Sequence, residues 1–245
     1  METTETTTTA AGDEQEKVSL WEDFIDIYFS PQEVFARRAD GGRWGLPLLL
    51  VMVLMVVLYF ASQSVLGPVV EQELTRAMEG NTEVTTAQME QAREMASTFG
   101  LIGFVVTYPI SILLAGVLLW GIGKLFDSVA TVGGAVLIAT YAQFPRLLQQ
   151  ALYLLQGLVL DVDSMESIQG LSIGPARFLD PDAVSPVVLG LVGRLDVFIL
   201  WGTVLLAIGL HQIGRVPRAQ AYFAAALVWG LAGLPILMGS LMGGG

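Results

Sequence analysis

Few side chains in this sequence are of the kinds that carry out catalysis or bind metal ions. Cysteine is absent, and histidine occurs once, as His211. Zinc, haem and iron–sulfur sites need several cysteine or histidine ligands, and a catalytic dyad needs a partner that one imidazole ring does not supply. We therefore expect no enzymatic activity, no metal site and no bound cofactor.

One acidic group has the spacing of a cation site. Asp161, Asp163 and Glu166 are close enough in the sequence to suggest bound calcium. They lack the glycine and the closing glutamate of the twelve-residue calcium loop, so a solvated charged loop is the favoured interpretation.

A second polar group falls inside apolar sequence. Gln143 and Arg146 interrupt one apolar stretch, and Arg194 and Asp196 open another. An unpaired charge at mid-depth in a bilayer costs about 2.5–3.5 kcal/mol on insertion scales. We therefore expect Arg146 and Asp196 to lie near each other, with Arg194 as the competing partner. A structural ion pair or an interfacial position is favoured over a polar site for a proton, an ion or a lipid headgroup.

The composition indicates which elements must position these side chains. Hydrophobic residues make up 53% of the 245 residues, charged residues only 14%, and the mean hydropathy is +0.63. Soluble domains are about 25% charged, so this chain is expected to be an integral membrane protein. Its net charge of −11 argues against a nucleic-acid partner.

Five stretches with few or no charged residues are long enough to cross a bilayer as helices. A hydrocarbon layer about 30 Å thick needs roughly 20 apolar residues at 1.5 Å rise each. The sequence shows no alternation with a period of two, so we expect an all-α, polytopic fold. The predicted spans, within a membrane domain of residues 44–243, are about 45–67, 98–121, 129–157, 187–212 and 220–242.

The charges between these stretches predict an orientation. The short connections are basic and the longer ones acidic, in strict alternation. Because lysine and arginine are retained on the cytoplasmic side, we expect a cytoplasmic N-terminus and a C-terminus on the opposite side of the cell membrane. The basic residues that decide this are Arg37, Arg38, Arg43, Lys124, Arg215 and Arg218.

Two kinds of sequence precede the first predicted span. Residues 1–18 are polar and low in complexity, and we expect them to be disordered. Residues 19–43 show apolar side chains at three- and four-residue spacing, which predicts a pair of amphipathic helices, the second with Ser30 as N-cap and Pro31 at its first position. These helices either lie in the cytoplasmic interface or pack on the bundle as a lid. Their candidate interaction surface consists of Trp21, Phe24, Phe29, Phe35, Arg37 and Arg38.

Five segments of the sequence carry a family pattern: Phe29–Phe35, Trp44–Leu49, the Gly121–Phe126 turn, Tyr141–Pro145 and Leu200–Leu210. Together they resemble the Yip domain, named for proteins that interact with Ypt/Rab GTPases, in its prokaryotic form. The resemblance covers roughly residues 21–240 and implies a five-helix membrane domain with a cytoplasmic N-terminus. Eukaryotic members resemble trafficking factors that bind prenylated Rab GTPases, but this chain lacks their Asp-Leu-Tyr-Gly-Pro segment.

These observations favour a non-enzymatic scaffold or partner-binding module in the membrane. Its expected partners are the lipid bilayer, proteins at the cytoplasmic face and, through small residues at helical spacing, a second copy of itself. The alternative is a transporter of an ion, a lipid or another small molecule, with a polar site between the third and fourth spans.

Overall fold

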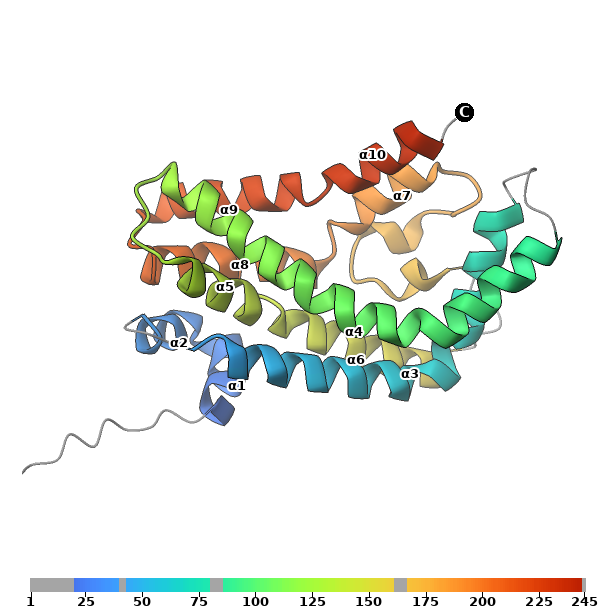
Figure 1. Cartoon of the computed structure of the whole chain (residues 1–245), viewed down its shortest axis with the longest axis horizontal. Coiled ribbons are helices and arrows are strands. Elements are labelled where there is room, and N and C mark those ends of the chain that lie inside the picture. The colour runs from blue at the N-terminus through green and yellow to red at the C-terminus, as the bar shows by residue number, and fades with distance from the viewer. Residues whose placement is uncertain (1–19, 40–42, 80–85, 161–166, 244–245) are drawn as a thin grey trace, which may run out of the picture.

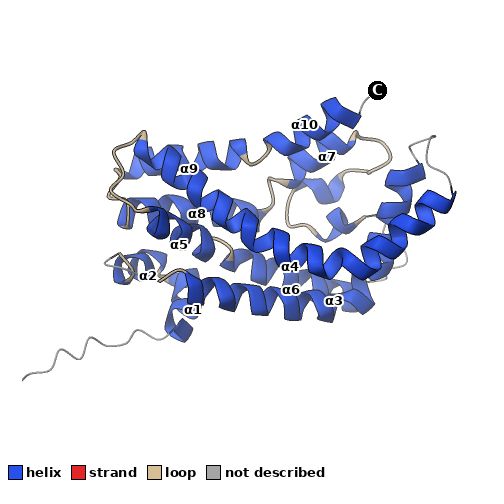
Figure 2. Cartoon of the chain, in the orientation of Figure 1, coloured by secondary structure: helices blue, strands red, loops and turns tan. Residues whose placement is uncertain are grey.

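The computed structural model describes residues 20–39, 43–79, 86–160 and 167–243. Within these ranges the regular elements are all helical and no strand occurs (Figure 2). The predicted disordered tail, residues 1–18, lies outside the described residues, as do Asp161, Asp163 and Glu166 of the candidate calcium loop. Among the described residues, no three His, Asp or Glu side chains come together as metal ligands.

Along the described residues, two short helices, two long ones and three broken pairs follow one another (Figure 1). The short helices stand at one end of the molecule, and the long ones run along its length. The elements are α1 (Leu20–Phe29), α2 (Pro31–Arg37), α3 (Gly45–Glu79), α4 (Thr86–Lys124), α5 (Val132–Tyr141), α6 (Phe144–Val159), η2 (Ile168–Leu171), η3 (Pro175–Phe178), α7 (Pro186–Gly193), α8 (Val197–Gln212), α9 (Arg218–Leu231) and α10 (Leu234–Gly243).

The long helices pack around α5, α6 and α8. Helix α4 packs against α5 and α9, α3 packs against α6, and α8 packs against α6 and α9. Helices α4 and α5 come very close at Gly116 of α4, where an added Cβ atom would stand 2.6 Å from the Cα atom of Val136 in α5. A glycine is needed at this crossing because any side chain would collide with the backbone of α5.

In the described part of the chain, three helical segments are long and apolar enough to cross a membrane: Gly45–Glu73, Ile102–Lys124 and Arg218–Gly239. Helices α7 and α8, bent by 53° at their junction, make a fourth if they form one broken span. The third predicted span, residues 129–157, is divided into α5 and α6. The division falls at Ala142–Gln143, just before Pro145, which has no backbone N–H for a continuous helical ladder.

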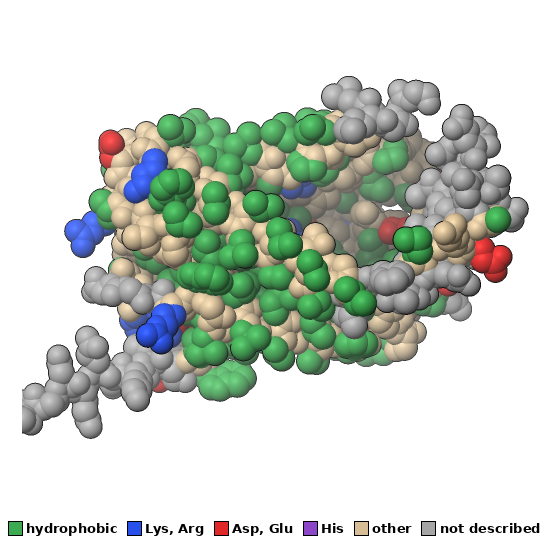
Figure 3. Space-filling model, in the orientation of Figure 1, with side chains coloured by type: hydrophobic (Ala, Val, Ile, Leu, Met, Phe, Trp, Pro, Cys, Tyr) green, Lys and Arg blue, Asp and Glu red, His purple; other side chains and the backbone are tan. Residues whose placement is uncertain are grey.

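The outer surface of the long helices is apolar. On α3, exposed side chains recur every three or four residues at Leu46, Leu49, Val53, Val57 and Phe60. Figure 3 shows hydrophobic side chains spread over the face formed by the long helices. An apolar surface of this extent needs a non-aqueous environment, which agrees with a membrane protein.

Basic side chains gather at the end of the molecule that carries α1 and α2 (Figure 3). Two tight connections meet there, because the backbone N–H of Val129 donates to the carbonyl of Gly214 at 3.0 Å. The Lys124 ammonium donates to the carbonyls of Ser128 and Ala130 at 2.6 and 3.1 Å, which closes the α4–α5 turn. We call this end, with its two connections, the basic end.

Candidate functional site

The buried carboxylate of Asp23 joins α1 and α2 to the bundle. Asp23 is only 1% exposed, and it accepts hydrogen bonds from Arg37 at 3.0 Å, from Arg38 at 2.6 Å and from the Tyr141 hydroxyl at 2.6 Å. Three donors around one carboxylate offset the cost of removing its charge from water. The contact connects α1, α2 and α5 at a single point.

One of the two arginines of this cluster, Arg37, also bonds to a second acid. Arg37 also donates to Asp26 at 2.7 Å. Burial alone lowers the pKa of Arg37, but its hydrogen bonds to Asp26 and Asp23 outweigh that effect and leave the pKa above its ordinary value. We call α1 and α2 together the cap. Arg37 is therefore a positively charged residue held in place within the cap.

Aromatic side chains complete the attachment of the cap. The rings of Phe24 and Phe144 lie 5.4 Å apart between centroids, and those of Tyr28 and Trp201 lie 5.7 Å apart. The Tyr28 hydroxyl donates to the carbonyl of Phe144 at 2.9 Å, and burial raises the pKa of this hydroxyl. Aromatic pairs of this kind add to the free energy of apolar burial, so the cap is held on α6 and α8 by packing as well as by charge.

This packing buries some side chains of the predicted interaction surface and leaves others exposed. The prediction that Phe35 belongs to an exposed surface is wrong: its side chain is 0% exposed, with its ring 5.9 Å from that of Tyr141. Phe24 is half-buried against Phe144, and Arg37 and Arg38 are bonded to Asp23. The cap thus packs on the bundle in the manner of a lid.

Another face of α1 remains open. Trp21 is 65% exposed and Phe29 is 83% exposed. Between them Ile25 is also exposed, and the four-residue spacing places all three on one face of the helix. The sequence prediction omitted Ile25, which this spacing would have revealed. We call these three side chains the α1 stripe.

Asp196, the acid of the predicted polar group, fastens a loop to a helix. It is 1% exposed and caps α8 by accepting from the backbone N–H of Phe198 at 2.9 Å. It also accepts from the Ser172 hydroxyl at 2.6 Å and from the backbone N–H of Ile173 at 2.9 Å. Asp196 therefore fixes the η2–η3 segment against the start of α8.

The expected ion pair of Arg146 with Asp196 does not form. Neither Arg146 nor Arg194 pairs with Asp196 in the described part of the chain. The reason is local: three short-range donors already occupy the carboxylate oxygens. Arg146 and Asp196 nevertheless share one region, since the Tyr153 hydroxyl lies within electrostatic range of both.

Gln143 lies at the break between α5 and α6. Its side-chain oxygen accepts from the Tyr108 hydroxyl of α4 at 3.2 Å, and its side-chain nitrogen donates to the carbonyl of Ala139 at 3.3 Å. The amide thus satisfies the backbone where the helix is interrupted and connects the break to α4.

Arg194 joins the α7–α8 break to the α9–α10 break. Its guanidinium donates to the carbonyl of Ala232 at 3.1 Å and to that of Trp229, and the Trp229 indole N–H donates back to the carbonyl of Arg194 at 3.3 Å. The arginine also lies over the Trp229 ring, 5.1 Å from its centroid. These contacts satisfy carbonyl groups at the end of α9 that a continuous helix would have bonded internally. No sequence pattern indicated Trp229 as a partner.

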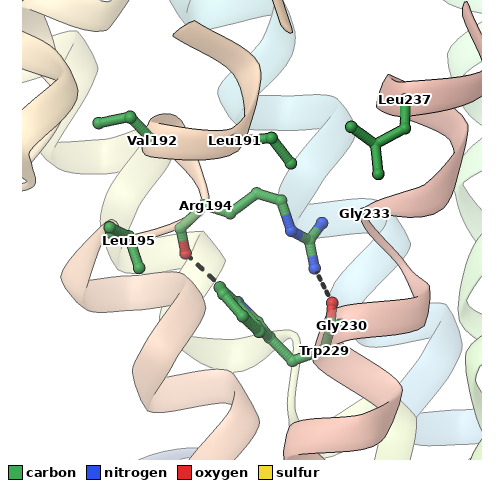
Figure 4. Close-up of a pocket in the computed structure, with 8 residues that line it drawn as sticks. All are labelled: Leu191, Val192, Arg194, Leu195, Trp229, Gly230, Gly233 and Leu237. Atoms are coloured by element: carbon green, nitrogen blue, oxygen red, sulfur yellow. Dashed lines mark hydrogen bonds between the residues drawn. The ribbon is translucent and has the colours of Figure 1, made fainter. Parts of the chain in front are cut away.

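A pocket of about 270 Å³ opens beside this junction (Figure 4). Arg194 crosses it, and the remaining lining is almost entirely apolar. Figure 3 shows this face of the molecule hollowed between α4 and the α9–α10 pair, with Lys or Arg atoms visible inside. The lining residues besides Arg194 are Leu191, Val192, Leu195, Trp229, Gly230, Gly233 and Leu237.

Comparison with known proteins identifies the relatives of this chain. The chain is 25% identical over 231 residues to "Membrane protein YknW" of Bacillus subtilis (strain 168), and the match covers 90% of this chain and 89% of that protein. No solved structure matches the chain. The Yip1 domain matches residues 25–239, nearly the whole helical bundle and most of the cap, and confirms the resemblance seen in the sequence. The chain therefore belongs to the Yip1 domain family of membrane proteins.

Proposed function

We propose that this protein is a non-enzymatic scaffold of the cell membrane that binds a protein partner at its cytoplasmic face. The observation that carries the proposal is the α1 stripe, Trp21, Ile25 and Phe29, which is exposed on a helix that Asp23 holds firmly to the bundle. The stripe is presented on a rigid support, as a recognition surface requires.

The orientation of the protein in the membrane is part of the proposal. The α5–α6 pair serves as a third, broken span and α7–α8 as a fourth, which gives five crossings with the ends of the chain on opposite sides. Lys124 ends α4, Arg215 lies between α8 and α9, and Arg218 begins α9. These helix ends lie at the same end of the molecule as the cap (Figure 1), which supports a cytoplasmic position for that end.

The residue types of the α1 stripe favour a protein partner. Covering an exposed tryptophan, isoleucine or phenylalanine contributes about 1.5–3 kcal/mol each, and tryptophan is enriched among the residues that dominate interface energies. Arg37 and Asp26 lie beside the stripe and supply a polar rim. The comparisons give no corresponding support for a transporter.

Site-specific photocrosslinking in native membranes tests the proposal. A photoreactive phenylalanine replaces Trp21, Phe29 or, as the control, Phe178, which is as exposed as Phe29 but lies in η3, away from the cap. We expect the same discrete protein adduct from positions 21 and 29 and none from position 178. Adducts to lipid alone, or one pattern at all three positions, would contradict a partner surface on α1.

A second crosslinking experiment tests whether the side chains of the α1 stripe bind the partner together. Trp21→Asp combined with Phe29→Asp should abolish the adduct formed from a photoreactive group at Ile25, because both neighbouring anchors are lost. Phe178→Asp should leave that adduct unchanged.

A further inference from the structure

We infer that α7 and α10 form one hinged pair, which the side chain of Arg194 holds closed against the rest of the membrane domain. Each helix is joined to the domain through a helix break, and residues of both breaks line the pocket shown in Figure 4. The motion of this pair does not require a partner at the α1 stripe.

The first observation is that the two helices pack mainly on each other. In the described residues, α10 packs chiefly on α7, and α7 packs on α10 and η3. An added Cβ atom at Gly190 of α7 would stand 3.1 Å from the Cγ2 atom of Ile236 in α10, so these helices are in close contact. No residue of α7 is buried, and Leu237 and Met238 of α10 are exposed. A pair with so few buried side chains has little packing energy to fix its position.

The second observation is that both helices adjoin a break where the backbone can bend. Helices α7 and α8 meet at an angle of 53°. Between α9 and α10, the backbone N–H of Gly233 donates to the carbonyl of Gly230 at 2.9 Å, and Pro235 has no N–H to donate. A few residues at the ends of helices are the usual place where a hinge absorbs changes in backbone angles.

The α5–α6 break provides an internal comparison. Ala142 and Ala232 follow α5 and α9 with the same backbone angles, φ −66° and ψ −9°, and each is followed by a proline three residues later. Beyond its break, however, α6 packs on α1, α3 and α8, and its Phe144 and Leu147 are buried. The two breaks therefore share one backbone geometry, but packing on the bundle fixes α6 and does not fix α10.

Arg194 is the connection between the pair and the fixed helices. It lies at the end of α7, and its guanidinium donates to the carbonyl of Ala232 at 3.1 Å and to that of Trp229, both at the end of α9. The Trp229 indole N–H donates back to the carbonyl of Arg194 at 3.3 Å, and the guanidinium lies over the indole ring. Hydrogen bonds from a charged donor are stronger than those between neutral groups. Arg194 therefore holds α7 against α9, and α10 is held with it.

The pocket lies where this motion needs space. Its volume is about 270 Å³, and it is lined by Leu191 of α7, Leu195 of the α7–α8 break, Trp229 of α9 and Leu237 of α10 (Figure 4). Protein interiors are normally close-packed, so a volume of this size leaves room for side chains to shift when the pair moves. Opening of the pair would widen this pocket.

Spin labels in the full chain test the motion, since the sequence has no cysteine. Cysteines are introduced two at a time from Val117→Cys on α4, Val188→Cys on α7 and Met238→Cys on α10, all at exposed positions. Distances are measured by dipolar spectroscopy in lipid nanodiscs. Without further change, we expect one narrow distribution for each pair of labels.

Arg194→Gln is the decisive variant. The ratio of displaced to undisplaced molecules should rise about tenfold or more for the 117–188 and 117–238 distances, because hydrogen bonds from a charged donor are lost. The 188–238 distance should stay unchanged, because the two helices move together. Trp229→Phe keeps an aromatic ring under the guanidinium and removes the N–H donor, so it should displace the pair in the same direction but less.

Two control variants are matched to these. Arg218→Gln removes an exposed arginine at the start of α9 and should leave all three distances unchanged. Gln143→Ala removes the side chain that donates to the carbonyl of Ala139 at the α5–α6 break. It should not alter the distance between labels at Val117→Cys and Leu155→Cys, the latter on α6, because packing fixes α6 beyond its break.

Three results would overturn the inference. The first is a set of distances in Arg194→Gln equal to those without it or, if that variant does not fold, unchanged distances in Trp229→Phe. The second is an increase of the 188–238 distance, which would mean that α7 and α10 separate. The third is an equal displacement of α6 in Gln143→Ala, which would mean that the loss of any side chain at a break has this effect.

Discussion

At the scale of single residues, two buried carboxylates decide how separate parts of this protein are fastened together. Asp23 gathers Arg37, Arg38 and Tyr141 around one point, and Asp196 ties the η2–η3 segment to the start of α8. Neither acid is a free charge available for proton transfer. Each has its oxygens occupied by donors that hold a neighbouring element in place.

Asp23→Asn should release the cap from the bundle. The NH2 group of asparagine is a donor, and it would face one of the donors around position 23 where a carboxylate oxygen now accepts. The two arginines would also lose their counter-charge. The expected loss of stability is at the low end of about 3–5 kcal/mol, because both arginines remain partly exposed. Limited trypsin digestion in detergent should then cleave faster after Arg37 and Arg38. Asp26→Asn, which removes only the more exposed partner of Arg37, is the control and should have a smaller effect. Equal cleavage of both variants would refute a central role for Asp23.

At the scale of elements, the sequence predicts the helices well and their breaks less well. Apolar length and charge-free stretches are sufficient to indicate where α3, α4 and α9 run. The α7–α8 break depends on contacts distant in the sequence, since Arg194 bonds to carbonyls of α9 and Asp196 to Ser172. A hydropathy pattern contains no information about such partners, which is also why the pairing of Arg146 with Asp196 was predicted and is not found.

The α4–α5 crossing gives a prediction at this scale. Gly116→Ala should lower the stability of the bundle by about 1–3 kcal/mol, because the new Cβ atom would stand 2.6 Å from the Cα atom of Val136 and the helices would have to separate. Gly121→Ala is the control, on the same helix with no atom within 4 Å, and should be neutral or slightly stabilising. Thermal unfolding in detergent compares the two. A Gly116→Ala protein as stable as the wild type would show that the close approach is not required.

At the scale of the whole molecule, the cap lies at the basic end, while the last turns of α3 and the first turns of α4 lie at the other end (Figure 1). The sequence predicts this division through the alternation of basic and acidic connections. It does not predict that the cap would bury Phe35 and leave the α1 stripe open, because both sets of side chains are apolar and only packing distinguishes them. The proposed partner surface therefore lies on the cap, at the basic end of the protein.

The central claim is that the chain crosses the membrane an odd number of times with its basic end in the cytoplasm. Since the sequence has no cysteine, single cysteines introduced as Thr3→Cys, Arg218→Cys, Phe178→Cys and Gly245→Cys can each be labelled with a membrane-impermeant maleimide. In intact cells, we expect labelling at positions 178 and 245, and labelling at positions 3 and 218 only after the membrane is permeabilised. Labelling of positions 3 and 245 from the same side would contradict the account.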